Sequence, residues 1–416
     1  MRAILLLLDG LGDRGVLNKK TPLQCAKTPN LDMLAKEGMC GIYKAYKEGV
    51  PLSTEIAHLL LWGYSLEDYP GRGVIEALGE DIKVEENKIY LRMSIASVKR
   101  DEKGFFILER RVKDIKDNEV EEILKEVPKV IDNYKFNMFY TGEGDFILEV
   151  GEKFDRVSDK ISDADPFYKN KYVLKVKAIK EICKDEEYPI AKSTAEAINK
   201  FMKCSYNLLD NIEFNKKREL KANFLLPKWA GKIKKVESFK DRWGLNGVVL
   251  AKSKLLKGLA RYLGLDFIRI DSLKEGFNLI NELNYDFIHI HTKEIDEVSH
   301  LKDPKEKIKA IEKVDNEIKN LKLKDSDLLI VTADHSTPSV GRLIHSGESV
   351  PILFYGKYVR KDKVKEFNEI SCSEGHLRIS GDELMYLILN YLDRALLLSL
   401  RPGGLYRYYP ENLEIL

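Results

Sequence analysis

An aspartate and a histidine stand side by side just after an apolar run. The run extends from Leu328 to Val331, and Asp334 and His335 follow it. A carboxylate oxygen and an imidazole nitrogen at the carboxyl end of a buried strand are donors that suit a hard or borderline divalent cation. The pair therefore predicts a metal site at this edge of a sheet.

Two more of the seven histidines fall near this pair with the spacing of metal ligands. Asp296 and His300 are four positions apart, which places both side chains on the same face of a helical turn. His345 lies shortly before another apolar run, again at the edge of a sheet. Together, Asp296, His300 and His345 predict a site of mixed oxygen and nitrogen donors.

A third cluster lies far away in the sequence, near the start of the chain. Asp9 directly follows the apolar run Ala3 to Leu8, so its carboxylate is expected at the sheet edge where open α/β proteins bind ligands. Ser53 and Thr54 precede the run His58 to Trp62, where a helix start presents hydroxyl and N–H groups to an anion.

A metal-bound hydroxyl has a lowered pKa and can act as a nucleophile. We therefore group Asp9, the hydroxyl at position 54, Asp334 and His335 as one predicted site, separate from the other three ligands. Two cations roughly 4 Å apart would hold the attacking and leaving oxygens of a phosphoryl transfer. The combined set favours phosphate chemistry.

Composition limits the kind of partner. Lys plus Arg number 69 and Asp plus Glu number 67, a balance that gives no electrostatic reason to expect nucleic acid or a membrane. The five cysteines form no CxxC pattern, which argues against a disulfide framework or a thiolate zinc site. No stretch of eighteen apolar residues occurs. We expect a cytoplasmic protein with a small-molecule substrate, and leave its oligomeric state open.

Several apolar runs are continuous rather than alternating, which is typical of parallel strands covered on both faces. They are Ala3 to Leu8, Gly247 to Leu250, Asp286 to Ile290, Leu328 to Val331 and Val350 to Tyr355. Helical patterns lie between them, the clearest from Pro304 to Leu321 after the capping residue Asp303. Ser193 and Glu196 have the spacing of a capping box. Strands that alternate with helices predict an α/β layered fold.

The middle of the chain has a different pattern. The segments Tyr90 to Val98, Phe105 to Glu109, Phe136 to Tyr140 and Phe146 to Val150 are short and partly alternating, as in antiparallel strands. We therefore expect an inserted α+β domain at residues 75–185, within a core domain formed by residues 1–74 and 186–416. The tail from Arg401 to Leu416 lies beyond these patterns, and they indicate no role for it beyond packing.

An ordered set of motifs along nearly the whole chain resembles the archaeal-type cofactor-independent phosphoglycerate mutases, which are alkaline-phosphatase-like metalloenzymes. These motifs are Asp9 to Asp13, Thr21 to Leu23, Lys27 to Asp32, Thr54 to His58, Gly71 to Gly73, Asp296 to His300 and Thr332 to His335. The resemblance implies a mixed, mostly parallel sheet in a three-layer core, with a lid-like domain inserted after the nucleophile.

The resemblance also implies a mechanism. 3-Phosphoglycerate gives its phosphoryl group to an enzyme hydroxyl, glycerate reorients, and its other hydroxyl takes the group back, so that free 2,3-bisphosphoglycerate is not needed. Thr54 would be the nucleophile and a ligand of one cation with Asp9, Asp334 and His335, while Asp296, His300 and His345 hold the other. Manganese, magnesium, cobalt and zinc all accept such ligands.

The choice of nucleophile depends on how this chain's residues match the family motif. Position 53 is usually glycine in the family and is serine here, and the nucleophile is often serine where this chain has threonine. Both hydroxyls therefore remain candidates, and the register to Ala57 and His58 favours Thr54.

Substrate contacts follow from the charge of a phosphoglycerate. Guanidinium groups bind phosphate and carboxylate oxygens bidentately, and the candidates are Arg72, Arg92, Arg110 and Arg111. By resemblance, Asp163 and Asp165 face the glycerate hydroxyls, and Lys257 matches a family lysine.

The chain departs from the family pattern at three of the positions near these residues. Phe167 stands where we expect histidine, and Lys228 and Trp229 stand where we expect arginine and glycine. Two alternative functions remain open. One is a phosphatase or phosphotransferase for another small phosphate or alcohol, since a shared metal centre serves many substrates. The other, suggested by the altered positions 53, 167, 228 and 229, is a non-catalytic relative with a binding or assembly role.

Overall fold

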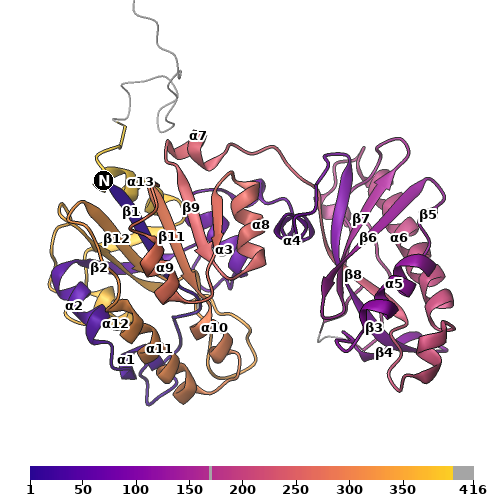
Figure 1. Ribbon diagram of the computed structural model, residues 1–416, viewed down its shortest axis with the longest axis horizontal. Coiled ribbons are helices and arrows are strands. Elements are labelled where there is room, and N and C mark those ends of the chain that lie inside the picture. The colour runs from indigo at the N-terminus through magenta and orange to yellow at the C-terminus, as the bar shows by residue number, and fades with distance from the viewer. Residues whose placement is uncertain (168–170, 397–416) are drawn as a thin grey trace, which may run out of the picture. The chain divides into compact units, whose positions relative to one another are not determined.

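The computed structural model describes residues 1–167 and 171–396, and the chain divides into two compact units (Figure 1). Unit 1 comprises Met1–Tyr69 and the chain from Val236 onward, and unit 2 comprises Pro70–Lys235. The tyrosine-containing tail, Arg401 to Leu416, lies outside the described residues. In the described part of the chain, no helix combines the length and the apolar character that crossing a bilayer requires.

Unit 1 contains an eight-stranded sheet with the order β10-β9-β11-β1-β12-β13-β2-β14. Its strands are β1 (Arg2–Leu8), β2 (Met39–Lys44), β9 (Gly247–Ala251), β10 (Asp266–Arg269), β11 (Phe287–Thr292), β12 (Asp327–Thr332), β13 (Val350–Tyr355) and β14 (Leu377–Ser380). Only β13 runs antiparallel to its neighbours in this sheet. The predicted α/β class with a mixed, mostly parallel sheet is confirmed.

Strand β1 lies at the centre of this sheet, between β11 and β12. All seven of its residues are buried, as a strand covered on both faces requires. At its start, Arg2 forms a two-pronged ion pair with Asp327 of β12, with its Nε 2.9 Å from Oδ1. Because the three strands are parallel, their carboxyl ends share one edge, and the residues that follow them are brought together there.

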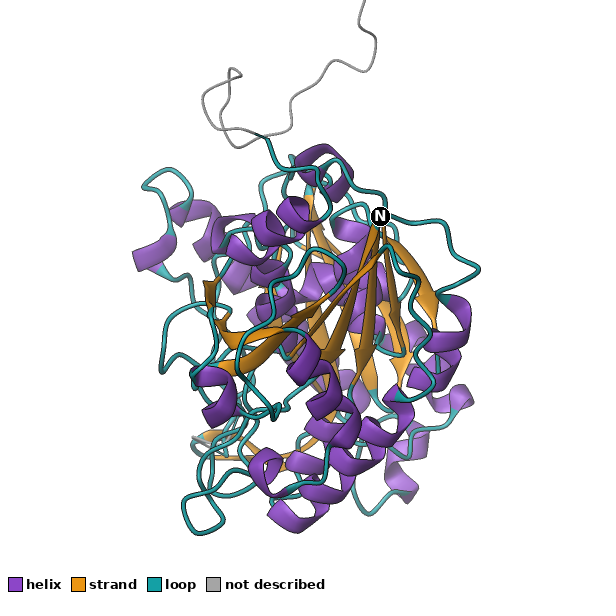
Figure 2. Cartoon of the chain, turned by 90° about the vertical axis from the view of Figure 1, so that its left-hand side faces the viewer, coloured by secondary structure: helices purple, strands orange, loops and turns teal. Residues whose placement is uncertain are grey.

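Helices cover both faces of the sheet, as Figure 2 shows. The helices of unit 1 are α1 (Pro22–Cys25), α2 (Pro29–Glu37), α3 (Thr54–Leu61), η1 (Leu66–Asp68), α7 (Phe239–Trp243), α8 (Lys254–Tyr262), α9 (Leu273–Leu279), α10 (Glu294–Ser299), α11 (Pro304–Ile318), α12 (Glu369–Ser373) and α13 (Glu383–Tyr391). Helices α1, α2, α9 and α10 contact α11, while α8 packs on β9 and β10 and contacts α3. Asp303 caps α11 as predicted, accepting a hydrogen bond from the backbone N–H of Lys305.

Unit 2 is built on an antiparallel sheet with the order β4-β3-β7-β6-β5, and β8 pairs with β3. Its strands are β3 (Lys88–Asp101), β4 (Gly104–Glu109), β5 (Val130–Ile131), β6 (Tyr134–Gly142), β7 (Asp145–Glu152) and β8 (Phe224–Gly231). Its helices are α4 (Arg72–Gly79), α5 (Asp117–Glu126), η2 (Lys180–Ile182), α6 (Tyr188–Leu209) and η3 (Glu213–Lys217). The expected antiparallel strands are present, and each is one to five residues longer than its sequence pattern.

Unit 2 extends well past residue 185, where the sequence pattern placed the end of the insert. Helix α6 belongs to this unit because its apolar face packs on the sheet, with the rings of Phe201 and Phe136 stacked 4.5 Å apart. Strand β8 belongs to it because it pairs with β3. The predicted capping box at Ser193 is wrong, since α6 begins at Tyr188 and Ser193 lies inside it, accepting a hydrogen bond from the hydroxyl of Tyr134.

Candidate metal centre

All seven predicted metal-site residues lie in unit 1, near the carboxyl edge of its sheet. Asp9 follows β1, and Asp334 and His335 follow β12. Thr54 is the first residue of α3, and Asp296 lies in α10. His300 is the residue after α10, and His345 lies in the segment before β13. The parallel strands thus place ligands from opposite ends of the chain side by side.

Three of these residues form a compact donor group. One ligand atom each from Asp9, Asp334 and His335 lies within 4.8 Å of the others. The Nε2 atom of His335 is 3.4 Å from Oδ1 of Asp9 and 3.2 Å from Oδ2 of Asp334. The Oγ1 atom of Thr54 is 3.5 Å from the same Nε2. These four residues are the ones that the sequence analysis assigned to one metal site.

A second donor group adjoins the first. Asp296, His335 and His345 also offer ligand atoms within 4.8 Å of one another, so His335 belongs to both groups. Nε2 of His345 is 3.7 Å from Oδ1 of Asp296, and Nε2 of His300 is 3.2 Å from that same oxygen. The structure therefore places His300 against Asp296, as the sequence spacing indicates, and adds His335 to this group.

The buried carboxylates have oxygen atoms that accept no hydrogen bond from the described residues. Neither Oδ1 of Asp9 nor Oδ2 of Asp334 has a hydrogen-bond donor among the described residues, and both residues are almost fully buried. Burial, together with the nearby charges of Asp9 and Asp296, raises the pKa of Asp334 well above its ordinary value. A buried anion without a partner is unfavourable, and a divalent cation would satisfy these oxygens. The donor set fits a cation of the predicted kind.

The histidines are held in orientations that suit metal binding. Nδ1 of His345 lies 2.6 Å from the backbone oxygen of Leu52, so it carries the proton and leaves Nε2 as the free electron-pair donor. Nδ1 of His335 lies 3.2 Å from the Thr337 hydroxyl. Burial lowers the pKa of His335 to about 4, so its ring is neutral near pH 7. A neutral imidazole is the form that binds a metal.

The sequence patterns missed a group of buried histidines beside these ligands. Nε2 of His291 is 3.1 Å from Oδ2 of Asp9. Nδ1 of His58 is 2.7 Å from the backbone oxygen of Thr54 and 3.7 Å from Oδ2 of Asp334. A signal was present, because His289 lies within the predicted apolar run Asp286 to Ile290 and His291 directly follows it, in the strand that pairs with β1. A polar residue within such a buried run usually has a specific partner.

Backbone geometry brings the loop after β1 close to the ligands. Gly10 has a φ of +68°, and a Cβ there would lie 2.9 Å from the Cβ of Asp296 and 2.6 Å from the Thr337 hydroxyl. The Thr337 hydroxyl in turn lies 2.7 Å from Oδ1 of Asp296. Glycine is therefore required at position 10 for the loop to reach the metal-ligand groups.

A fully buried lysine joins the two loops that carry the ligands. Nζ of Lys307, on α11, donates hydrogen bonds to the backbone oxygens of Gly10, Gly12 and Thr337 at 2.7–2.9 Å. It also lies 3.3 Å from Oδ2 of Asp13. A buried ammonium needs such partners, so Lys307 fixes the loop after β1 against the loop after β12.

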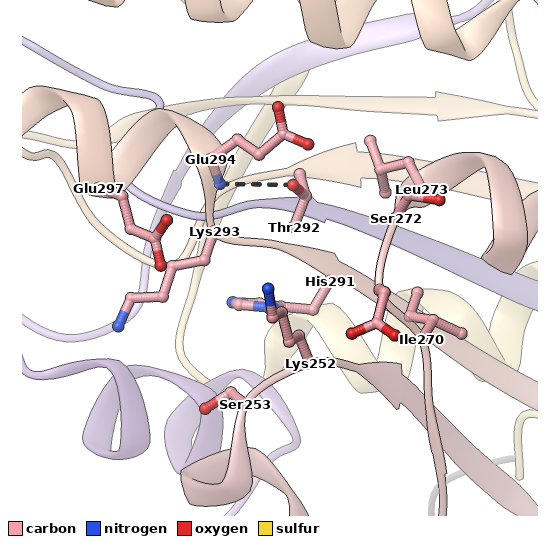
Figure 3. A pocket seen from close by; sticks show the side chains of 11 residues that line it. Lys252, Ser253, Ile270, Ser272, Leu273, His291, Thr292, Lys293, Glu294 and Glu297 are labelled. Atoms are coloured by element: carbon pink, nitrogen blue, oxygen red, sulfur yellow. Dashed lines mark hydrogen bonds between the residues drawn. The ribbon is translucent and has the colours of Figure 1, made fainter. Parts of the chain in front are cut away.

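A cavity of about 410 Å³ opens beside the metal-ligand groups at the carboxyl ends of β9, β10 and β11 (Figure 3). Its walls include Lys252, Ser253, Ser272 and Lys293, and also His291, the residue that contacts Asp9. Most residues that line the cavity are polar, and one of them, His291, also contacts the metal ligand Asp9.

The predicted arginines lie together in unit 2, where they share carboxylates. Arg72 and Arg92 both contact Glu76, at 2.7 and 3.0 Å. Arg92 and Arg111 both contact Asp145, at 2.6 and 2.7 Å. Although burial opposes its charge, the ion pairs with Glu76 and Asp145 hold the pKa of Arg92 above its ordinary value.

Asp165 completes this group, which we call the guanidinium cluster: Arg72, Arg92, Arg110, Arg111 and Lys228 with the carboxylates of Glu76, Asp145 and Asp165. Asp165 accepts hydrogen bonds from Arg110 at 2.6 Å and from Lys228 at 3.0 Å. Asp163 accepts one from the backbone N–H of Trp229. The remaining predicted substrate residue, Lys257, lies in α8 of unit 1.

Comparison with known proteins gives a consistent result. The model of the Metalloenzyme superfamily matches residues 1–391. The chain is 63% identical to 2,3-bisphosphoglycerate-independent phosphoglycerate mutase 2 of Methanocaldococcus jannaschii, over 100% of this chain and 99% of that protein. It is 34% identical to the 2,3-bisphosphoglycerate-independent phosphoglycerate mutase of Methanococcus maripaludis, over 95% of this chain and 99% of that protein.

A solved structure agrees with this relationship. The cofactor-independent phosphoglycerate mutase of Thermoplasma acidophilum superimposes with a TM-score of 0.65 at 28% identity, covering 94% of this chain and 99% of that one. The resemblance inferred from the sequence motifs is therefore confirmed. The chain belongs to the family of 2,3-bisphosphoglycerate-independent phosphoglycerate mutases, within the Metalloenzyme superfamily.

Proposed function

We propose that this protein interconverts 3-phosphoglycerate and 2-phosphoglycerate through a phosphothreonine at Thr54, without free 2,3-bisphosphoglycerate. One observation carries the mechanism: the Thr54 hydroxyl lies at the start of a helix beside His335, whose ring contacts Asp9 and Asp334. Family membership supports the reaction itself.

Thr54 is favoured over Ser53 as the nucleophile. Its side chain is almost fully buried and points toward the ligand atoms, with Oγ1 3.5 Å from Nε2 of His335. Ser53 is the N-cap residue of α3, and its side chain makes no capping hydrogen bond. The first turn of a helix also presents backbone N–H groups to an anion, which suits a phosphoryl group arriving at Thr54.

Asp9, Thr54, Asp334 and His335 would hold one divalent cation, and Asp296, His300 and His345 the other, with His335 close to both. When bound, the cations lower the pKa of the attacking hydroxyl and neutralise charge on the phosphoryl oxygens. Manganese, magnesium, cobalt and zinc all fit these donors.

The phosphoryl group is transferred in two steps, first to the enzyme and then back to glycerate. First, Oγ1 of Thr54 forms a bond to phosphorus, the bond from phosphorus to the C3 oxygen breaks, and that oxygen gains the proton that Thr54 loses. Glycerate then turns, its C2 hydroxyl oxygen forms a bond to phosphorus, the bond from phosphorus to Oγ1 of Thr54 breaks, and Oγ1 gains the proton that the C2 hydroxyl loses. The guanidinium cluster would bind the phosphate and carboxylate oxygens, since guanidinium forks match such groups.

The remaining predicted residues would bind the glycerate. Asp163 and Asp165 would take its hydroxyls, and Lys257 would add a positive charge. Water must be kept away from the phosphothreonine, because its hydrolysis would turn the enzyme into a phosphatase.

The experiment that tests this proposal measures two products at once. The full-length protein is incubated with 3-phosphoglycerate and Mn²⁺ or Mg²⁺, and 2-phosphoglycerate and inorganic phosphate are quantified over time. We expect 2-phosphoglycerate as the main product without added 2,3-bisphosphoglycerate. Mainly inorganic phosphate would indicate a phosphatase instead, and no product with either metal would favour a non-catalytic relative.

A further inference from the structure

Trp229 occupies a backbone position that normally requires glycine. In the pairing of β8 with β3, Tyr90 faces Gly231 and Arg92 faces Lys228, so β8 contains one extra residue between these pairs. This arrangement is a β-bulge, and Trp229 within it has a φ of +56°. A bulky residue at positive φ is strained, whereas glycine is relaxed there. The strained backbone at Trp229 therefore needs an explanation in what its side chain does.

The bulge itself does not need the indole ring. Its stabilising hydrogen bond runs from the backbone N–H of Trp229 to Oδ1 of Asp163, at 2.6 Å. Any residue other than proline supplies that N–H, glycine included. The side chain at this position is consequently free to serve another purpose.

The indole ring lies against three cations of the guanidinium cluster. The guanidinium carbon of Arg72 is 4.3 Å from the ring centroid, and that of Arg92 is 5.6 Å away. Nζ of Lys228 lies 5.0 Å from the same ring. Contacts at these distances are cation–π interactions, for which tryptophan is the strongest of the aromatic side chains.

The backbone that carries Arg72 is fixed against the same bulge. A Cβ on Gly73 would come within 2.9 Å of the Trp229 backbone oxygen, and one on Gly71 within 2.7 Å of the Ala230 oxygen. The start of α4 is therefore packed directly on β8. The backbone of Arg72 is thus fixed. Its side chain is oriented by the ion pair with Glu76 and by the contact of its guanidinium group with the Trp229 ring.

We propose that Trp229 is a positioning residue for substrate binding: its ring holds the guanidinium groups of Arg72 and Arg92 in the orientation that binds the anionic groups of a phosphoglycerate. The inference rests on the proposed function and on the guanidinium cluster as its anion site. A guanidinium that is already oriented loses less side-chain freedom when the anion binds, so the ring increases substrate affinity.

Three variants of the full-length protein, assayed with Mn²⁺ and 3-phosphoglycerate, test this role. Trp229→Gly removes both the ring and the backbone strain, Trp229→Leu removes the aromatic character, and Trp229→Phe retains an aromatic ring as the matched control. We expect the KM to rise about tenfold in the glycine and leucine variants, with kcat changed by less than about threefold. The phenylalanine variant should stay within about threefold of the wild-type KM.

Thermal unfolding of the same variants separates positioning from a purely structural role. Because glycine is relaxed at this φ and keeps the hydrogen bond to Asp163, Trp229→Gly should unfold within a few degrees of the wild type. A KM within twofold of wild type in Trp229→Gly would overturn the proposal. So would equal rises in KM in the glycine and phenylalanine variants, or a parallel fall in kcat and thermal stability.

Intrinsic fluorescence provides a second readout. The chain has three tryptophans, and Trp62 and Trp243 lie in unit 1. We expect 3-phosphoglycerate to change the emission of the wild type and Trp229→Phe to lose most of that change. An unaltered response in Trp229→Phe would contradict a ring in contact with the anion-binding arginines. If the wild type formed no 2-phosphoglycerate at all, the proposed function would fail instead, independently of these variants.

Discussion

At the scale of single residues, the chemistry depends on a hydroxyl beside buried imidazole and carboxylate groups. Thr54, His335, Asp9 and Asp334 come from three separate segments, yet their polar atoms lie 3.2–3.5 Å apart along the contacts of His335. Each of these side chains is buried, so a cation there would be screened little by water. Of the two candidate nucleophiles, the Thr54 hydroxyl should be essential for catalysis and the Ser53 hydroxyl should be dispensable.

Replacing each hydroxyl in turn tests this expectation. Thr54→Ala should lower kcat more than about 1000-fold, because it removes the atom that receives the phosphoryl group. Ser53→Ala should keep kcat within about threefold, since the Ser53 side chain does not cap the helix. Steady-state formation of 2-phosphoglycerate measures both, with Thr54→Ser as the variant that retains a hydroxyl. An inactive Ser53→Ala with an active Thr54→Ala would assign the nucleophile to position 53.

His289 provides a prediction about pH. It is fully buried, accepts a hydrogen bond from the Trp62 indole N–H on Nδ1, and has its pKa held well below 6.5 by burial and by His58 and His291. His289 of the unfolded chain binds a proton at low pH that the folded state excludes. The contribution of this residue to the free energy of unfolding is therefore fully present above about pH 6.5 and is lost as the pH falls below that value.

His289→Gln removes this titration, although it also alters packing. Between pH 7 and pH 5, the wild type should therefore lose about 2 kcal/mol more unfolding free energy than the variant loses. Denaturant unfolding of the metal-free proteins at the two pH values measures the shift. An equal difference at both pH values would show that His289 is not kept neutral by the fold.

At the scale of elements, the site is assembled by strands that end at one edge and by α11 behind them. Lys307 on α11 links the loop after β1 to the loop after β12 through three backbone oxygens and Asp13. Gly10 allows the first of these loops to approach Asp296. The ligand positions therefore depend on a residue that binds neither metal nor substrate.

Lys307→Met should weaken metal binding and stability together. The methionine keeps much of the packing, but it removes the buried ammonium that donates to three backbone oxygens and pairs with Asp13, which is expected to cost about 3–5 kcal/mol. We expect the Mn²⁺ concentration needed for half-maximal activity to rise at least about tenfold. Titration with Mn²⁺ and thermal unfolding check both effects, with exposed Lys309→Met on the same helix as the control. A normal Mn²⁺ requirement in Lys307→Met would mean that the loops hold their positions without it.

The sequence predicted these elements unevenly, for physical reasons. Asp9, Asp334 and His335 could be found because each follows a continuous apolar run, and parallel strands bring such ends together. The contacts of His58, His289 and His291 could not be predicted, because they depend on how α3 and β11 pack at the strand ends, which the local pattern does not show. Ser193 was misplaced as a cap because tertiary packing starts α6 earlier than its local pattern indicates.

At the scale of the whole molecule, the metal ligands and the guanidinium cluster belong to different compact units. All the predicted metal ligands lie in unit 1, and the arginines lie in unit 2 with Trp229. The end of the insert could not be predicted from composition, because α6 and β8 join unit 2 through long-range packing and strand pairing. Removing the metal should therefore affect the two units differently.

Metal removal should destabilise unit 1 selectively. If Mn²⁺ is present at about 1000 times its Kd, its removal should lower the stability of the state that binds it by about 4 kcal/mol. Hydrogen exchange after chelation should show faster exchange at the ends of β1 and β12 and in α3, while β3 and β7 of unit 2 keep their protection. Added Mn²⁺ should restore the slow exchange. Equal loss of protection in both units would contradict a metal centre confined to unit 1.

The most direct test of the account is to find the phosphoryl group on the enzyme. The full-length protein with Mn²⁺ is mixed with 3-phosphoglycerate labelled in its phosphoryl group, quenched in acid during turnover, digested, and examined by mass spectrometry. We predict label on the peptide that contains Thr54, at Thr54 itself, and none in Thr54→Ala. Rapid turnover with no label on this peptide, or label on another residue, would contradict the proposed nucleophile.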